Sequence, residues 1–144
     1  MFKSNMPAFF APVELPLFES WLDDLDKGRE GKKGTIYNYV LFEEQQPMAC
    51  GGFSIGAHDQ KATMAWGMVH RNHHRRGLGR EFLNFRINRI RQMFPSSFIA
   101  LDTTQFSVGF YEKQGFVVTG MTKDFYAPGL DRYDMVFRAD NISL

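Results

Sequence analysis

The hydrophobic pattern of the chain changes abruptly at Gly77, and this change limits the folds that the sequence can adopt. Upstream of Gly77, three runs rich in β-branched and aromatic residues are separated by short turns, which predicts three antiparallel strands. These runs are residues 35–44, 48–56 and 61–70. Downstream, apolar residues recur every three or four positions from Leu78 to Phe94, and Pro95 ends the pattern, so a long amphipathic helix is expected.

Shorter elements flank this strand-to-helix unit. Spacings of three and four among leucines and Phe18 predict a helix over residues 15–28, followed by a glycine- and lysine-rich loop at 28–34. After Pro95 we expect a strand at 97–102, a short helix at 107–115, and strands at 116–121 and 132–138. The order predicts an α+β protein with a mixed, mostly antiparallel central sheet flanked by helices, and residues 1–144 are expected to form a single domain.

The cysteine content and the distribution of apolar residues limit the cellular environments that suit the protein. Cys50 is the only cysteine among the 144 residues, so no internal disulfide can form, which is typical of a reducing compartment. The segment "AFFAPV" at 8–13 is too short and too interrupted by proline for the core of a signal peptide, and no apolar run reaches membrane-spanning length. We therefore expect a cytoplasmic protein without a membrane partner.

The small net charge of +1 conceals a strong asymmetry. Residues 70–91 carry seven arginines and one acid, a net +6, whereas the rest of the chain carries ten basic and fifteen acidic residues, a net −5. One element is thus suited to an anion, but the chain as a whole does not have the spread of basic charge that a nucleic-acid partner requires. We expect no nucleic-acid binding.

The stretch "VHRNHHRRGLGREF" at 69–82 joins the third predicted strand to the long helix. The first amides of a helix have no partner within the helix, and the helix dipole adds partial positive charge at that end. Glycines allow phosphate oxygens to approach the backbone, and Arg75, Arg76 and Arg80 add charge. This combination favours binding of a phosphate group.

Other interpretations of this loop fit less well. A dinucleotide-binding G-x-G-x-x-G would need glycine where Phe82 stands, and no Gly-Lys-Ser/Thr of a P-loop is present. The H-x-x-H-H pattern at 70, 73 and 74 has no helix to align metal ligands and lies among arginines that repel a cation, so we expect no metal. Taken alone, Gly-Leu-Gly is equally compatible with a basic loop that only adds solubility.

A second segment, "LDTTQFSVGFYEKQGFVV" at 101–118, sharpens the interpretation. Together the two segments resemble the GNAT family of acyl-CoA-dependent N-acetyltransferases. The family's Q/R-x-x-G-x-G/A motif corresponds to residues 74–79, and its Tyr-Glu-Lys-x-Gly-Phe motif corresponds to residues 111–116. The resemblance spans residues 36–144. Two positions depart from it: His74 replaces the usual Gln or Arg, and Thr104 stands where an Asn often begins the second motif.

The resemblance implies a site for acetyl-CoA between the strand that ends at His70 and the strand at 97–102. Pantetheine amides would pair with the backbone of residues 68–70, and the pyrophosphate would lie on the glycine loop. Thr104 would stand at the start of the next helix, near the pantetheine arm. The expected acetyl-CoA contacts are Met68, Val69, His70, His74, Arg75, Arg76, Gly77, Leu78, Gly79, Arg80 and Thr104.

The same resemblance suggests Tyr111 as the general acid for the departing CoA sulfur. A phenol has a pKa near 10 and a thiol about 8.5, so full proton transfer is uphill by about 2 kcal/mol, and Tyr111 would mainly donate a hydrogen bond. The alternative is an ordinary helix aromatic packed against Phe116.

The base for the attacking amine is less evident. Many family members carry a Glu on the strand before the glycine loop, but residues 61–70 contain no carboxylate. His70 and Asp102 are the available substitutes, because imidazole titrates near neutral pH and a carboxylate can attract a cationic amine. Each also has a structural alternative: His70 as a strand-end residue and Asp102 as a cap of the following turn.

Acceptor recognition would fall to the helix at 15–28, the loop at 28–34 and the segment 123–134. In the last of these, Phe125, Tyr126 and Tyr133 with Asp131 and Asp134 would suit a cationic amine, whereas Pro128-Gly129 could simply form a hairpin turn. The sequence thus predicts transfer of an acetyl group from acetyl-CoA to a primary amine of a small molecule or peptide. A non-catalytic acyl-CoA-binding module that senses the ligand, and a homodimer, both remain open.

Overall fold

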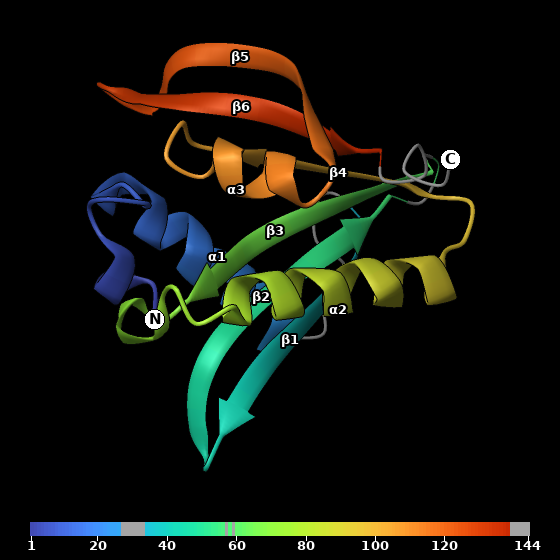
Figure 1. Ribbon diagram of the computed structural model, residues 1–144, viewed down its shortest axis with the longest axis horizontal. Coiled ribbons are helices and arrows are strands. Elements are labelled where there is room, and N and C mark those ends of the chain that lie inside the picture. Colours follow the sequence, from blue (N-terminus) through green and yellow to red (C-terminus); the bar gives the residue numbers. More distant parts are fainter. Residues whose placement is uncertain (27–33, 57, 59, 139–144) are drawn as a thin grey trace.

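The computed structural model describes residues 1–26, 34–56, 58 and 60–138, which form a six-stranded sheet with the strand order β1-β2-β3-β4-β6-β5 (Figure 1). The strands are β1 (Thr35–Glu43), β2 (Gln46–Ile55), β3 (Lys61–Val69), β4 (Phe98–Thr103), β5 (Phe116–Ala127) and β6 (Leu130–Phe137). The helices are α1 (Leu15–Asp26), α2 (Leu78–Met93) and α3 (Val108–Lys113), with 3-10 turns at Lys3–Asn5, Pro12–Glu14 and Arg71–His73. The α+β class and the mostly antiparallel sheet are confirmed.

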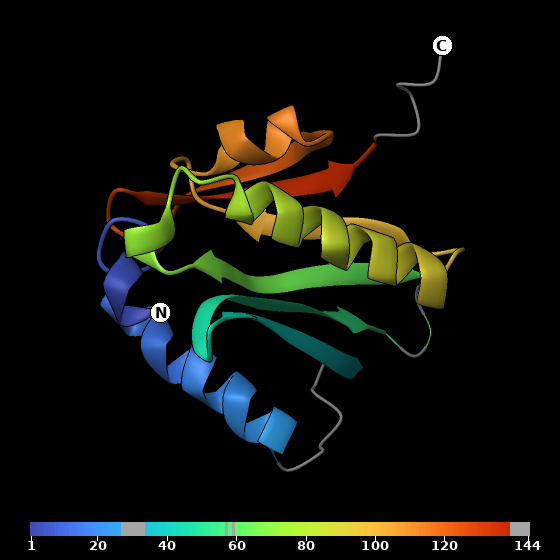
Figure 2. The same ribbon diagram turned by 60° about the horizontal axis from the view of Figure 1, so that its bottom comes forward.

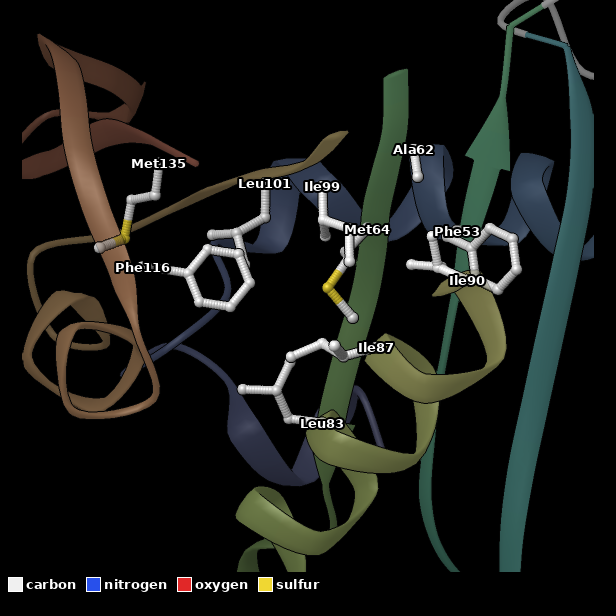
Figure 3. Packing of buried hydrophobic residues seen from close by; sticks show 10 residues of the cluster. All are labelled: Phe53, Ala62, Met64, Leu83, Ile87, Ile90, Ile99, Leu101, Phe116 and Met135. Atoms are coloured by element: carbon white, nitrogen blue, oxygen red, sulfur yellow. The ribbon is translucent and has the colours of Figure 1, made fainter. Parts of the chain in front are cut away.

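Helices cover both faces of the sheet. α2 lies along one face and α1 lies across the opposite side, as the rotated view shows (Figure 2). The main core forms between α2 and the sheet, where Leu83, Ile87 and Ile90 point toward Met64 and Ile99 (Figure 3). Val108 and Tyr111 of α3 pack against the same cluster, so α2 and α3 share a face. Their shared face positions the glycine loop and the short helix beside each other.

The amphipathic pattern of α2 is confirmed with two differences. Phe85, predicted on the apolar face, is 44% exposed and meets the ring of Tyr39 edge-on at a centroid distance of 5.2 Å. Arg86, which sequence analysis grouped with the anion-facing arginines, is only 4% exposed. The buried stripe of the helix therefore includes a cation.

The N-terminal region contains no strand within residues 1–26, where the chain forms two 3-10 turns and then α1. α1 begins at Leu15 as predicted and is described to Asp26, and the predicted loop at 28–34 lies outside the described residues except for Gly34. A second cluster, built on Phe2, Cys50 and Met68, packs with Phe18 and Trp66. It attaches the N-terminal region to β2 and β3.

β3 and β4 pair in parallel over only three residues. The register joins Lys61 through Thr63 to Phe98 through Ala100, and beyond these positions the two strands have no pairing with each other. β3 continues to Val69 and β4 continues to Thr103, with β6 paired along the other edge of β4. The β2–β3 register also shifts between Cys50 and Gly52, and Trp66 has a φ of +51°, so a bulge bends β3 where it leaves β4. The sheet is therefore parted at its centre.

The last two strands are longer than predicted. Residues 123–134, for which acceptor recognition and a Pro-Gly hairpin turn were both left open, lie in a β5–β6 hairpin that turns at Pro128-Gly129. The Asp124 carboxylate accepts a hydrogen bond from the Gly129 amide at 2.7 Å, and the Asp131 carboxylate accepts one from the Asp124 amide at 2.9 Å. Asp131 is thus engaged in holding the turn, which favours the hairpin interpretation.

Candidate active site

The glycine loop forms an open helix terminus at one side of the parted strands. Gly77 caps α2 with a φ of +80°, a conformation that favours glycine, and no atom lies within 4 Å of where its Cβ would be. The first hydrogen bond of α2 runs from the Glu81 amide to the Gly77 carbonyl at 3.1 Å. The amides from Leu78 to Arg80 come before this first bond, so they have no partner within the helix and are available to an anion.

Cationic side chains surround this helix end. Arg75, Arg76 and Arg80 are all exposed, and Arg76 donates from Nη1 to Nδ1 of His73 at 2.9 Å. Gly79 packs closely on α3, since a Cβ there would lie 3.6 Å from the Phe110 ring. The loop thus contacts the short helix that carries Tyr111.

His74 is directed back toward the protein. Its Nε2 donates to the Val69 carbonyl at 2.9 Å, its ring meets Phe9 at a centroid distance of 5.5 Å, and Asn5 Nδ2 donates to the same carbonyl at 2.9 Å. The carbonyl of Val69 therefore already accepts two hydrogen bonds, the capacity of its two lone pairs. His74 connects the loop to the N-terminal segment through contacts that sequence analysis had not foreseen.

His70 ends β3 in a well-defined geometry. Its amide donates to the Met48 carbonyl at 2.9 Å, and its Nδ1 accepts from the Asn72 amide at 3.2 Å. Because Nδ1 accepts, the neutral ring carries its proton on Nε2. In this arrangement neither ring nitrogen has a free lone pair for a substrate proton.

Tyr111 lies on α3 with its ring in the core. The ring meets Phe110 and Phe116 edge-on at centroid distances of 5.1 and 5.6 Å, so the packing alternative is partly realised. Its hydroxyl lies close enough to the Arg86 guanidinium for the two groups to interact electrostatically. Burial raises the pKa of the Tyr111 phenol, and the positive charge of Arg86 opposes that rise.

Thr104 precedes α3. Its carbonyl accepts from the amides of Ser107 and Val108 at 3.0 and 3.2 Å, which fixes the start of the helix. The residue is 6% exposed, and its Oγ1 has no hydrogen-bond partner within the described part of the chain. A buried hydroxyl without a partner is costly, so this oxygen is available to a bound molecule.

Arg86 is a residue that sequence reasoning missed. Its Nη1 donates to the Gly52 carbonyl at 3.4 Å, and its guanidinium lies 5.0 Å from the Phe82 ring centroid. Burial lowers the pKa of the Arg86 guanidinium. The sequence contained a signal, since Arg86 follows Leu83 by three positions and precedes Ile90 by four, on the apolar stripe of the helix.

Asp102 lies at the end of β4 in a polar group built from β5, β6 and the Pro12–Glu14 turn. It accepts a hydrogen bond from the Tyr126 hydroxyl and lies 3.6 Å from Arg132, which also pairs with Asp134 at 2.9 Å. Burial and this hydrogen bond raise the pKa of Tyr126. Burial lowers the pKa of Arg132, but Asp102 and Asp134 outweigh it and the pKa is raised.

Glu14 is a second residue that sequence reasoning missed. It is 8% exposed, and its Oε2 accepts from the Ala11 amide at 2.7 Å. Burial raises the pKa of the Glu14 carboxyl, the Ala11 hydrogen bond opposes this, and the charge of Asp102 adds to the rise. Its position in a short turn, with no regular hydrophobic period, gave no signal in the sequence.

A cavity of about 370 Å³ opens beside Asp102. It is lined by β3, β4 and β6, with Thr63, Ala100, Arg132 and Asp134 among its residues.

Within the ranges that the structure describes, no three His, Cys, Asp or Glu side chains gather as a metal site would need, and no helix is long and apolar enough to cross a membrane.

The residues present fit an acyl-CoA. Three features lie along the parted strands or at their ends. They are the open space beside Gly77, the first amides of α2 and the unpartnered Thr104 hydroxyl. The sheet is mixed and parted, a glycine caps the helix after β3, and a tyrosine lies on the helix after β4. This combination defines an acyl-CoA-dependent N-acyltransferase. Comparison with known families agrees: the acetyltransferase (GNAT) domain family matches residues 21–139, and the chain belongs to this family.

Solved structures share the fold. A protein from Desulfovibrio desulfuricans assigned to the GNAT family matches with a TM-score of 0.77 and 18% identity over 95% of this chain and 87% of that one. The ribosomal-protein-S18-alanine N-acetyltransferase from Escherichia coli matches with a TM-score of 0.67 and 18% identity, over 83% of this chain and 74% of that one. A chimera of the Vibrio cholerae spermidine N-acetyltransferase matches with a TM-score of 0.69 and 16% identity, over 86% and 78%. No curated protein sequence matches the chain significantly.

Proposed function

We propose that this acetyltransferase moves an acetyl group from acetyl-CoA to a primary amine of a small molecule or a peptide. The observation that carries the proposal is the gap between β3 and β4, with an anion-binding helix end at one side and Tyr111 at the other. Two structurally similar proteins are named for an alanine of a ribosomal protein and for spermidine, and both acceptors offer a primary amine.

In this proposal the glycine loop holds the phosphates of acetyl-CoA. The amides of residues 78–80 donate to the pyrophosphate, and the exposed Arg75, Arg76 and Arg80 add charge around it. The amide of Val69 and the Thr104 hydroxyl are available to the pantetheine arm, whereas the Val69 carbonyl is already engaged. Acetyl-CoA supplies the reactive thioester, and the chain supplies its orientation.

Tyr111 is proposed as the proton donor to the departing sulfur. Burial keeps the phenol protonated at neutral pH, so it can donate a hydrogen bond where negative charge develops. Its packing between Phe110 and Phe116 fixes the ring, which limits the rotation of the hydroxyl away from the reacting atoms.

Asp102 is the proposed group that attracts the acceptor. It is exposed at the end of β4 and borders the cavity, where a cationic or partly neutral amine would approach. His70 is the weaker candidate for taking the amine proton, because its Nδ1 lone pair is already used by Asn72. An α-amine, with a pKa near 7.8, would need little help in losing its proton at neutral pH.

Calorimetric titration of acetyl-CoA tests the phosphate site. Compared with the unchanged protein, the double variant Arg76→Glu, Gly79→Glu should lose binding, because both changes put negative charge at the helix end. Gly79 is chosen because a Cβ there meets Phe110 at an ordinary contact distance, whereas any side chain at Gly77 would be strained. The control is Asn84→Glu, Arg89→Glu, which makes the same charge change farther along α2 and should retain binding.

Thiol release with a panel of amines then tests transfer. Diamines, amino acids and short peptides with free N-termini should separate the acceptor classes. Binding of acetyl-CoA without turnover of any amine would contradict the acceptor proposal. Equal loss of binding in both double variants would contradict the placement of the phosphates.

A further inference from the structure

Arg86 occupies an unusual environment in the core. It is 4% exposed, and among the described residues no carboxylate pairs with it. Its Nε has no hydrogen-bond partner among the residues that the structure describes, and the hydrogen bond from its Nη1 to the Gly52 carbonyl is long at 3.4 Å. A buried cation without an anion is expensive, so its presence calls for a reason beyond packing.

The strands opposite Arg86 are shaped around its head group. A Cβ on Gly67 would lie 2.5 Å from Nη2, and a Cβ on Gly51 would lie 2.7 Å from Nη1. Glycine at these two positions leaves room for the guanidinium where it lies. Gly51 and Gly67 both lie at the β2–β3 bulge, beyond the last residue at which β3 pairs with β4. The charge is thus placed under the parted end of the sheet.

The groups that face Arg86 are weak acids. They are the Tyr111 hydroxyl of α3 and the Cys50 thiol of β2, and the charge of the Asp102 carboxylate of β4 also acts on Tyr111. Burial raises the pKa values of both Tyr111 and Cys50, so both are neutral at physiological pH. The cation therefore lies beside a phenol that becomes an anion only if it gives up its proton.

We propose that Arg86 is a positioning residue for Tyr111: its guanidinium holds the phenol oxygen in place and stabilises the phenolate that forms when the proton leaves. This inference rests on the proposed role of Tyr111 as proton donor. In that step the O–H bond of Tyr111 breaks as an S–H bond forms on the departing CoA thiolate. The negative charge passes to the phenol oxygen next to Arg86, and solvent later returns a proton to it. A fixed cation at this position is electrostatic preorganisation.

The first experiment follows the titration of Tyr111 without any turnover. The protein is prepared with 3-fluorotyrosine at position 111, whose phenol titrates at lower pH, and is followed by fluorine NMR. Arg86→Met should move the midpoint upward by about one to two pH units, because the positive charge that favours the phenolate is lost. Arg89→Met is the matched control on the same helix and should leave the midpoint unchanged. An unchanged midpoint in Arg86→Met would overturn the inference.

The second experiment measures kcat. Arg86→Met should lower kcat about 10- to 100-fold with the acetyl-CoA Kd within about twofold, and should have no further effect in a Tyr111→Phe background. Equal losses of kcat in both backgrounds would show that Arg86 does not act through Tyr111. Arg86→Lys keeps the positive charge and should recover part of kcat. If Arg86→Met does not fold, Arg86→Gln replaces it in both experiments.

Two results distinguish this inference from the proposed function. If the protein turns over no amine, the proposed function fails, but the midpoint still reports whether Arg86 stabilises the phenolate. If Arg86→Met instead changes the pH dependence of Cys50 alkylation and leaves Tyr111 unchanged, the guanidinium serves the thiol, and the inference is wrong.

Discussion

Arg80 and Arg86 lie on the same helix within two turns of each other, yet their surroundings are opposite. Arg80 is exposed in the first turn of α2, where its charge is surrounded by water and salt. Arg86 is buried against β2 and β3, where its charge is little screened. A surface cation attracts a charged ligand from a distance and weakly, whereas a buried cation acts strongly on a single neighbour. In the roles proposed above, the same residue type would serve binding at one point and chemistry at the other.

The largest expected effect on kcat comes from removing the Tyr111 hydroxyl, which lies beside the buried Arg86. Tyr111→Phe should lower kcat about 10²- to 10⁴-fold, the usual scale for a general acid, while the acetyl-CoA Kd stays nearly constant. The ring packing against Phe110 and Phe116 is retained, so the melting temperature should change little. Parallel kinetics and calorimetry check this, and a variant that loses kcat and binding together would instead indicate damage to the fold.

Gly67→Ala tests whether the buried arginine needs the space that the strand leaves for it. The new Cβ would lie 2.5 Å from Nη2, so the guanidinium must move away from Gly52 and Tyr111. We expect a loss of about 1–3 kcal/mol in the free energy of unfolding and a lower kcat. Gly109→Ala provides the control, because nothing lies within 4 Å of a Cβ there. Full activity in Gly67→Ala would show that the position of the guanidinium is not critical.

The exposed arginines should show a different signature. Arg76→Ala and Arg80→Ala should each weaken acetyl-CoA binding about 3- to 10-fold at low salt, in the range of about 1 kcal/mol for a surface charge. The difference from the unchanged protein should shrink as salt rises, because the Debye length falls to about 3 Å at 1 M. The effect of Arg86→Met on kcat should be insensitive to salt. Calorimetry and kinetics across a salt series separate the two classes of arginine.

The same contrast explains what could be predicted from the sequence. The glycine loop and Tyr111 could be proposed from the sequence because each belongs to a local pattern: a strand, a turn and a helix start that are contiguous in the chain. The burial of Arg86 depends on Gly51 and Gly67, which are distant in sequence and whose lack of a side chain matters only once the strands lie under α2. The β5–β6 hairpin was likewise underestimated, because its Asp124 and Asp131 contacts form only after the strands pair.

The smallest predicted effect concerns Glu14, a buried acid beside the site. Its pKa is raised in the folded protein above the ordinary value of 4.5, so the folded state holds the proton more tightly than the unfolded chain. The stability from this group is therefore full below about pH 4.5 and is lost as the pH rises through the folded-state pKa. Glu14→Gln should remove this pH dependence.

The comparison is made by urea unfolding of both proteins from pH 4 to pH 8. The variant should resemble the unchanged protein at pH 4, where Glu14 is protonated, and gain relative to it toward pH 8. Because the Ala11 amide still needs an acceptor, the amide oxygen of Gln should retain part of that hydrogen bond. A constant difference across the pH range would mean that Glu14 titrates alike in the folded and unfolded states, and that its burial does not govern its charge.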